Sequence, residues 1–164
     1  MAVVNKPTIT DNEKVNINRA QAEHRGTWMA LMFDEMRKAG LDAETITRKA
    51  IDRTGHFHGV NWKAQVANPD DVREFDAAFF NELGKGTFEI KTESNPNEVR
   101  AEFHYCPLLA AWQKQGFDDE TLAKLCDLAM QGDRAIAAEM GYNLDIEQTI
   151  AEGCPTCMLH FYKK

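Results

Sequence analysis

Two stretches in which apolar and polar residues alternate limit how this chain can fold. In residues 87–92 every second side chain is apolar or β-branched, and the same alternation returns in residues 99–105. The segment between them contains Ser-Asn-Pro-Asn at positions 94–97, which is typical of a turn. An alternation with period two on both sides of a turn predicts a β-hairpin with one apolar face.

A second hairpin is expected near the end of the sequence. Its first strand contains Leu144, Ile146 and Ile150, and a turn follows at residues 153–155. Its second strand continues the alternation with Cys157, Leu159 and Phe161. Two hairpins supply four strands, and strands joined by short turns pair in antiparallel fashion.

The rest of the chain has helical character. Caps and breakers predict N-terminal helices over residues 18–39, 42–55 and 68–84, and a helix pair over 107–115 and 118–140. The expected fold class is therefore α+β, with N-terminal helices plus a four-stranded, mainly antiparallel sheet built from two β-hairpins separated by a helix pair. Residues 1–15 are expected to form a loose N-terminal arm, and residues 16–164 a single domain.

Charge excludes several kinds of partner. The chain has 164 residues, and its 19 Lys and Arg against 26 Asp and Glu give a net charge of -7. Nucleic acids and anionic membranes bind basic surfaces, so neither is expected as a partner. The polar first 14 residues lack the apolar core of a secretion signal, which favours a cytoplasmic protein. Its four cysteines are then expected as thiols or metal ligands.

Several ionisable residues are spaced so that they fall on the same side of a predicted helix as its apolar residues. On the first helix Trp28, Leu31 and Met32 define an expected apolar stripe, and both His24 and Glu35 fall within it. A buried lone charge is costly, so inward-facing charges must form ion pairs or serve a site. Both interpretations remain open here.

The same analysis applies to two later helices. Arg53 shares the expected apolar side of the second helix. Asp133 lies in the middle of the stripe of the long helix that also contains Cys126, while Asp127 and Arg134 lie at its margins. These residues predict either structural ion pairs or a polar pocket, between the helices and the sheet, for a small charged ligand.

The thiols of Cys106, Cys126 and Cys157 are expected to converge with Asp133. Buried cysteines usually act as small apolar residues, but a thiol becomes a nucleophile when a neighbour lowers its pKa. Several converging thiols could instead bind Zn²⁺. Cys154 and Cys157 form a single C-x-x-C motif, which is a weak zinc signal and lacks the strand-then-helix context of a redox motif.

The sequence resembles the L-2-amino-thiazoline-4-carboxylic acid hydrolase family over nearly all of the chain after residue 20. The combination of Cys106, Cys126, a Gly-Asp-Arg element at 132–134 and Cys157-x-x-x-Phe161 is specific. The final residues, 153–161, are also weakly similar to the end of 4-vinyl reductase-type small-molecule-binding domains. Further matching segments are 23–28, 34–42, 50–59, 103–108 and 149–153.

The resemblance implies hydrolytic opening of a thiazoline ring to give N-carbamoyl-L-cysteine. Arg53 or Arg25 would hold the substrate carboxylate, and Asp133 or Asp127 would anchor its amidine-like ring. Three attacking groups are possible: water activated by a carboxylate, the thiol of Cys126 or Cys106, or water on a thiol-bound divalent metal such as zinc. The enzyme would therefore need either no cofactor or such a metal. The expected catalytic residues are Cys106, Cys126, Asp127, Asp133 and Cys157, and the expected substrate-binding residues are His24, Arg25, Glu35, Arg53 and Arg134.

Two other functions compete with this one. A non-catalytic sensor domain would use the same pocket to bind a small molecule or metal. A structural subunit would carry an exposed apolar patch, which the sequence alone does not locate. The expected partner is a small-molecule substrate, and the sequence also allows a homo-oligomer.

Overall fold

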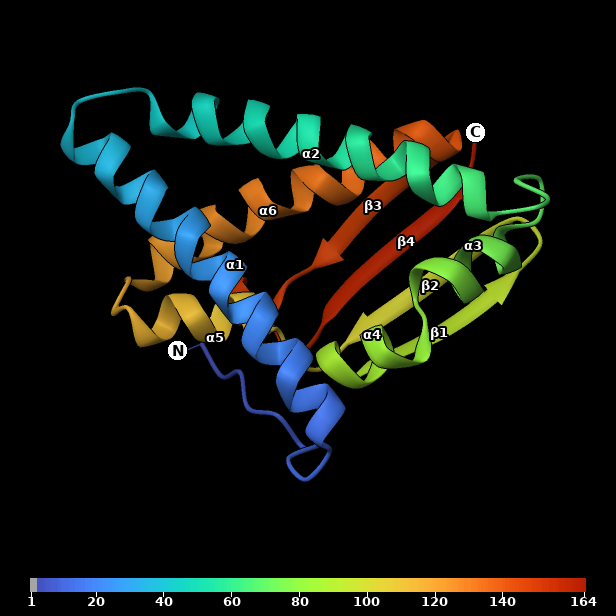
Figure 1. Ribbon diagram of the computed structural model, residues 1–164, viewed down its shortest axis with the longest axis horizontal. Coiled ribbons are helices and arrows are strands. Elements are labelled where there is room, and N and C mark those ends of the chain that lie inside the picture. The colour runs from blue at the N-terminus through green and yellow to red at the C-terminus, as the bar shows by residue number, and fades with distance from the viewer. Residues whose placement is uncertain (1–2) are drawn as a thin grey trace.

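The computed structural model describes residues 3–164 and shows an α+β fold, as the sequence predicts (Figure 1). In chain order the elements are α1 (Glu13–Lys38), α2 (Ala43–Gln65), α3 (Val72–Phe79), α4 (Glu82–Phe88), β1 (Ile90–Asn95), β2 (Glu98–Phe103), α5 (Pro107–Lys114), α6 (Asp119–Met140), β3 (Tyr142–Gln148), the 3-10 turn η1 (Ile150–Glu152) and β4 (Cys157–Lys163).

Both predicted hairpins are present and together form one antiparallel sheet. The strand order is β1-β2-β4-β3, so the hairpins meet where β2 pairs with β4. Val99 lies opposite Phe161, and Ala101 lies opposite Leu159. These four side chains are all buried, whereas most of their strand neighbours are not. The alternation seen in the sequence therefore marks the face of the sheet that the helices cover.

The helix pair between the hairpins also agrees with the prediction, because its caps are strong. The Asp118 side chain accepts a hydrogen bond from the Thr121 backbone N–H at 2.8 Å and starts α6. Gly141 ends the same helix in the left-handed conformation at φ 80°. Pro107 lies in the first turn of α5, where a missing N–H costs nothing.

The helix expected over residues 42–55 is longer than predicted. Gly55 was expected to end it, but α2 continues through Gly55 and Gly59 to Gln65. Both glycines lie where α2 packs on α6: a Cβ on Gly55 would come within 2.6 Å of the Ala135 Cβ, and one on Gly59 within 2.8 Å of the Glu139 Cβ. These two glycines allow α2 and α6 to cross closely, and neither of them ends the helix.

The helix expected over residues 68–84 is in fact two helices. The chain leaves α3 at Phe80, and the Asn81 side chain accepts a hydrogen bond from the Gly84 N–H at 3.0 Å to start α4. The first strand consequently begins at Ile90 rather than at residue 87. In the second hairpin, Ile150 belongs to η1 rather than to a strand.

The buried face of α1 is not the predicted one. Trp28, Leu31 and Met32 are exposed, and so are His24 and Glu35. The face that packs on α4 and α5 instead contains Val15, Arg19, Ala22, Gly26, Ala30 and Phe33. Its small side chains allow a close approach, since the Gly26 carbonyl accepts a hydrogen bond from the buried Trp112 indole at 2.9 Å.

Two apolar clusters form the core. One lies among α1, α5, α6 and η1, and the other lies between α3, α6 and the sheet. Phe75 of α3 contacts Phe161 of β4, with ring centroids 5.3 Å apart, and so fixes the helical layer on the sheet. No helix within residues 3–164 combines the length and the apolar character that crossing a membrane requires.

Candidate functional site

Three thiols lie in or against the first core cluster, and one of them, Cys157, also packs against the second. Cys126 on α6 is buried, while Cys106 before α5 and Cys157 at the start of β4 pack against the same cluster. Each sulfur of the latter pair accepts a backbone hydrogen bond: Cys106 from the Leu109 N–H at 3.5 Å, and Cys157 from the Ile150 N–H at 3.2 Å. The structure therefore brings together the three thiols that the sequence pattern groups.

These thiols are held in their protonated form. Burial is the largest cause, and it raises the pKa of Cys106 and Cys126 above the usual value and that of Cys157 to about 12. Mutual proximity adds to the effect, because Cys106 raises the pKa of both other thiols. A protonated thiol is a poor nucleophile and a poor metal ligand. Cys154 lies in the turn before β4, and all four cysteines are free.

Asp133 lies beside this cluster on α6. Burial raises the pKa of its carboxyl group to about 6, although nearby Arg25 opposes the shift. Within residues 3–164 its side chain forms neither an ion pair nor a hydrogen bond to another side chain. A carboxyl group with a pKa near neutrality exchanges a proton readily in either direction at physiological pH. Such a group, without a structural partner, is typical of a catalytic position.

Arg25 projects from α1 toward the same region. Its positive charge lowers the pKa of both Asp133 and Cys106, which places it near the two groups. Arg25 is exposed and makes no ion pair with any residue that the structure describes. Figure 1 shows α1 crossing in front of α5 and α6. The positive charge of Arg25 on α1 therefore acts on the acid of α6, and its guanidinium is available for a ligand carboxylate.

Two other predicted site residues on α6, Asp127 and Arg134, are already engaged; Arg134 directly follows Asp133, and Asp127 lies six residues before it. Asp127 pairs with Arg48 of α2 at 2.7 Å and with Arg134 at 2.8 Å. Burial works to raise the pKa of Asp127, but the two guanidinium groups outweigh it and hold that pKa below its usual range. This three-residue network links α2 to α6 and leaves neither Asp127 nor Arg134 a free charge for a ligand.

The remaining predicted site residues lie apart from Asp133. His24 stacks on Trp28 on the exposed face of α1, with ring centroids 5.1 Å apart, and Glu35 pairs with Lys38 at 2.7 Å. Arg53 is exposed on the outer face of α2. The inward orientation predicted for these three residues is wrong, because the helices bury the opposite faces.

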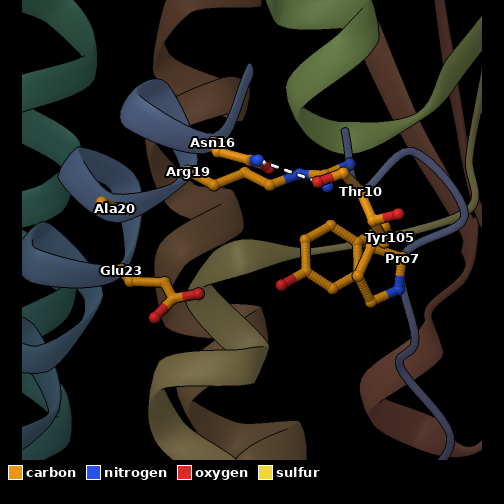
Figure 2. Close-up of a pocket in the computed structure, with 7 residues that line it drawn as sticks. All are labelled: Pro7, Thr10, Asn16, Arg19, Ala20, Glu23 and Tyr105. Atoms are coloured by element: carbon orange, nitrogen blue, oxygen red, sulfur yellow. Dashed lines mark hydrogen bonds between the residues drawn. The ribbon is translucent and has the colours of Figure 1, made fainter. Parts of the chain in front are cut away.

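A hollow of about 270 Å³ lies between α1 and the N-terminal segment (Figure 2). Figure 2 shows the Glu23 carboxylate and the Tyr105 hydroxyl pointing toward one another across it. Glu23 is already paired with Lys114, and Asn16 donates to the Thr10 carbonyl at 2.9 Å. Glu23 and Asn16 therefore already have partners, unlike Asp133.

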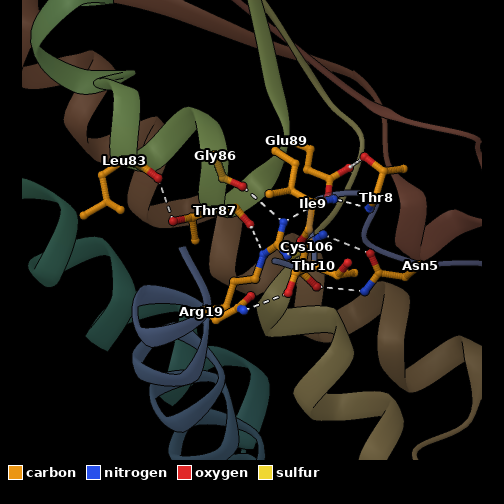
Figure 3. A network of polar contacts seen from close by, with 11 residues as sticks. Asn5, Thr8, Ile9, Thr10, Arg19, Leu83, Gly86, Thr87, Glu89 and Cys106 are labelled. Carbon is orange, nitrogen blue, oxygen red and sulfur yellow. Dashed lines mark hydrogen bonds and ion pairs between the residues drawn. The ribbon is translucent and has the colours of Figure 1, made fainter. Parts of the chain in front are cut away.

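A buried ion pair beside this hollow escaped the sequence analysis. Arg19 of α1 contacts Glu89 at 2.9 Å, and Glu89 also accepts hydrogen bonds from Thr8 and Ile9 (Figure 3). Asn5 exchanges two hydrogen bonds with the Cys106 backbone, at 2.8 and 2.9 Å. The N-terminal segment is thus fixed against the thiol cluster. The sequence did contain one indication of this burial, because the spacing of Arg19 places it on the same side of α1 as Ala22, Gly26 and Phe33.

The donor set does not form a metal centre of the usual kind. In the described part of the chain, no three His, Cys, Asp or Glu side chains are arranged so that they could hold a metal ion. What the arrangement offers is an acid-base group, Asp133, next to an available cation, Arg25, and three neutral thiols. This combination suits binding of a small anion and transfer of a proton.

Comparisons with known proteins agree with the sequence pattern. A family profile described as L-2-amino-thiazoline-4-carboxylic acid hydrolase matches residues 19–161. No protein with a curated description matches significantly. Among solved structures, the chain is similar to a trafficking protein particle complex subunit 3 from Naegleria fowleri, covalently bound to palmitic acid. The identity is 14%, the TM-score is 0.40, and the match covers 94% of this chain and 84% of that one.

Proposed function

Because this chain belongs to the L-2-amino-thiazoline-4-carboxylic acid hydrolase family, we propose that it opens the ring of a small sulfur- and nitrogen-containing heterocyclic acid by hydrolysis. The first candidate substrate is L-2-amino-thiazoline-4-carboxylate, which would give N-carbamoyl-L-cysteine. The observation that carries the proposal is the pair of Asp133 and Arg25, an acid with a pKa of about 6 beside a cation that forms no ion pair in the described residues.

Each group in the pair has a role that matches this chemistry. Arg25 binds the substrate carboxylate through a bidentate charge-assisted contact. Asp133, in its ionised form, takes a proton from water as the water oxygen adds to the ring carbon between nitrogen and sulfur. The C=N electron pair moves onto the ring nitrogen, which takes up the proton of the new hydroxyl group as the carbonyl forms. The bond between the ring carbon and sulfur breaks, and Asp133 returns the first proton to the departing sulfur. The sum is one water added per substrate, with no oxidant or reductant.

Water is the attacking group in this mechanism rather than a cysteine. Burial keeps the thiols of Cys106, Cys126 and Cys157 protonated at neutral pH, so none supplies a thiolate. Their neutral sulfur atoms instead form an apolar wall beside Asp133. A wall of this kind excludes bulk water and sustains the raised pKa of the carboxyl group.

We also propose a cytoplasmic location and a small molecule as the partner, rather than a nucleic acid or a membrane. Four free cysteines suit a reducing compartment. A net charge of -7 disfavours binding to polyanions.

The test is mass spectrometry of L-2-amino-thiazoline-4-carboxylate incubated with the purified protein. Enzyme-dependent addition of one water, lost by at least about 100-fold in Asp133→Asn, is the expected result. A parallel binding measurement with the unreacted acid separates two failures. Binding without turnover would support a sensor domain, and absence of both would reject this substrate.

A further inference from the structure

The outer faces of α1 and α2 carry most of the exposed apolar side chains. Eight of the ten exposed large hydrophobic residues within 3–164 lie between Ile17 and Val60. Figure 1 shows the two helices as arms of a V that meet at the turn after Lys38. Single exposed apolar residues need no explanation, but a concentration on one helical hairpin marks an interaction surface.

The positions of these residues suggest what the surface binds. Most of the exposed apolar residues on each helix fall on a series of positions four and three residues apart, the spacing of a coiled-coil seam, and polar residues or alanine occupy the other positions of the series. On α1 the series is Ile17, Gln21, His24, Trp28, Leu31 and Glu35, and all six are exposed. On α2 the series is Ile46, Ala50, Arg53, Phe57 and Val60, again all exposed. A seam with this repeat fits another helix.

The outer face of α2 also contains a recess suited to a side chain from such a helix. A hollow of about 370 Å³ is lined by Ala50, Arg53, Thr54 and Phe57. These positions are i, i+3, i+4 and i+7, the four residues that surround a hole in knobs-into-holes packing. Two of the four lining residues, Ala50 and Thr54, have small side chains.

The outer face of α1 supplies the matching knob. Trp28 is 61% exposed, and His24 stacks against its ring and restricts it. The seams also carry opposite charges, because Glu35, which pairs with Lys38 on the exposed surface of α1, is on one seam while Arg53 is on the other. One chain therefore carries both the projecting Trp28 and a recess that could receive it, and both the acidic and the basic residue of a possible ion pair. A surface that is complementary to itself produces a two-fold symmetric contact between identical chains.

We propose that the outer faces of α1 and α2 bind a second copy of this chain, with Trp28 of each copy entering the recess at Ala50 of the other. In this arrangement Glu35 of one copy meets Arg53 of the other. The seams run about 20–27 Å along helices about 10 Å wide, or on the order of 500 Å² per copy. That area is near the lower limit for a specific interface, in the range of weak or transient contacts. This inference does not depend on the proposed reaction.

The test is sedimentation velocity of the full chain from about 1 µM to about 200 µM. The mass is expected to rise with concentration from 18.6 kDa toward twice that value. Leu31→Asp and Ala50→Arg should hold the protein at the single-chain mass. Leu83→Asp is the matched control, because Leu83 on α4 is 44% exposed and Leu31 is 46% exposed. Circular dichroism checks that each exposed-site variant is folded.

A charge exchange tests that the occupant is a second copy. Arg53→Glu should weaken the dimer by about tenfold or more, because two acidic groups then face one another across each seam. Adding Glu35→Arg should restore most of the affinity. The proposal is overturned if the wild-type chain stays monomeric over the whole range, including if it instead binds phosphatidylcholine vesicles. It is also overturned if Leu31→Asp and Ala50→Arg dimerise like Leu83→Asp.

Discussion

Gly55 of α2 lies directly against Gly132 of α6, with its missing side chain directed at the Gly132 backbone. A methyl group there would overlap the Gly132 carbonyl oxygen and would approach the Gly132 Cα to 2.9 Å. The reverse is not true, because a methyl group on Gly132 would meet only the Ile51 Cγ2, at an ordinary 3.5 Å. Asp133 follows Gly132, so this crossing also sets the position of the candidate acid.

The crossing predicts opposite results for two similar substitutions. Gly55→Ala should lower the free energy of unfolding by about 1–3 kcal/mol, since α2 must move away from α6. Gly132→Ala should change it by less than about 1 kcal/mol, because alanine favours the helix and the space is open. Urea denaturation of both variants measures the difference. Equal losses in the two variants would contradict the asymmetry.

Asp133 should make the protein less stable as pH rises. Its pKa is about 6 in the folded state against 3.8 ordinarily, so the folded state binds more protons between these values. The contribution of protonated Asp133 to the free energy of unfolding is therefore fully present below about pH 4 and is lost as the pH rises through about 6. The free energy of unfolding of Asp133→Asn should exceed that of the wild type by on the order of 1–3 kcal/mol at pH 7, and the two should differ little at pH 4. Denaturation at both pH values tests this, and a pH-independent difference would contradict it.

Arg25→Gln should weaken substrate binding more than catalysis. Loss of a charge-assisted contact with the substrate carboxylate predicts a KM increase of about 10- to 100-fold with a smaller change in kcat. The pH midpoint of kcat/KM should also move upward, because Arg25 lowers the pKa of Asp133. Arg100→Gln, on the outer face of the sheet, is the control and should change neither value. A purely structural role for Arg25 would leave the pH midpoint in place.

Cys106→Ser should keep turnover within about tenfold of wild type, since water rather than this thiol attacks the substrate. Serine is also a good N-cap residue and can accept the Leu109 N–H hydrogen bond that starts α5. Steady-state kinetics of Cys106→Ser and Asp133→Asn, measured under the same conditions, provide the comparison. A loss as large as that of Asp133→Asn, in a folded variant, would identify the sulfur as the reacting group.

Glu89→Gln should be strongly destabilising, by about 3–5 kcal/mol, because it leaves the Arg19 charge buried without its partner. Glu147→Gln removes the exposed ion pair with Arg100 and should cost less than about 1 kcal/mol. Unfolding by urea gives both values. Limited proteolysis should also cut Glu89→Gln near Thr8 and Ile9, which Glu89 holds in the wild type.

The sheet and α6 could be predicted because their signals are local. Alternation on either side of a turn defines each hairpin, and Asp118 and Gly141 define both ends of α6. The length of α2 could not be predicted in this way. Gly55 has the same appearance in a sequence whether it ends a helix or lies at a crossing, and only the contact with α6 distinguishes the two.

The candidate site was predictable to the extent that its residues lie on correctly phased elements. Asp133 and Cys126 follow from α6, Cys157 follows from the second hairpin, and Cys106 follows from the start of α5. The α1 residues were misplaced because that helix has two apolar faces. The exposed one carries large side chains such as Trp28, while the buried one relies on small residues such as Gly26 and Ala30. Arg19 and Glu89 pair across 70 positions of sequence, which no local pattern reveals.

The strand order has a consequence for how the chain is made. β4 is the last strand of the four, yet it lies between β2 and β3 and pairs with both. A ribosome must therefore release residues 157–163 before the sheet can close, so the fold is completed only after these residues emerge. Until then the backbone edge of β2 that pairs with β4 stays open, and nascent chains stalled before residue 157 are the ones expected to need a chaperone.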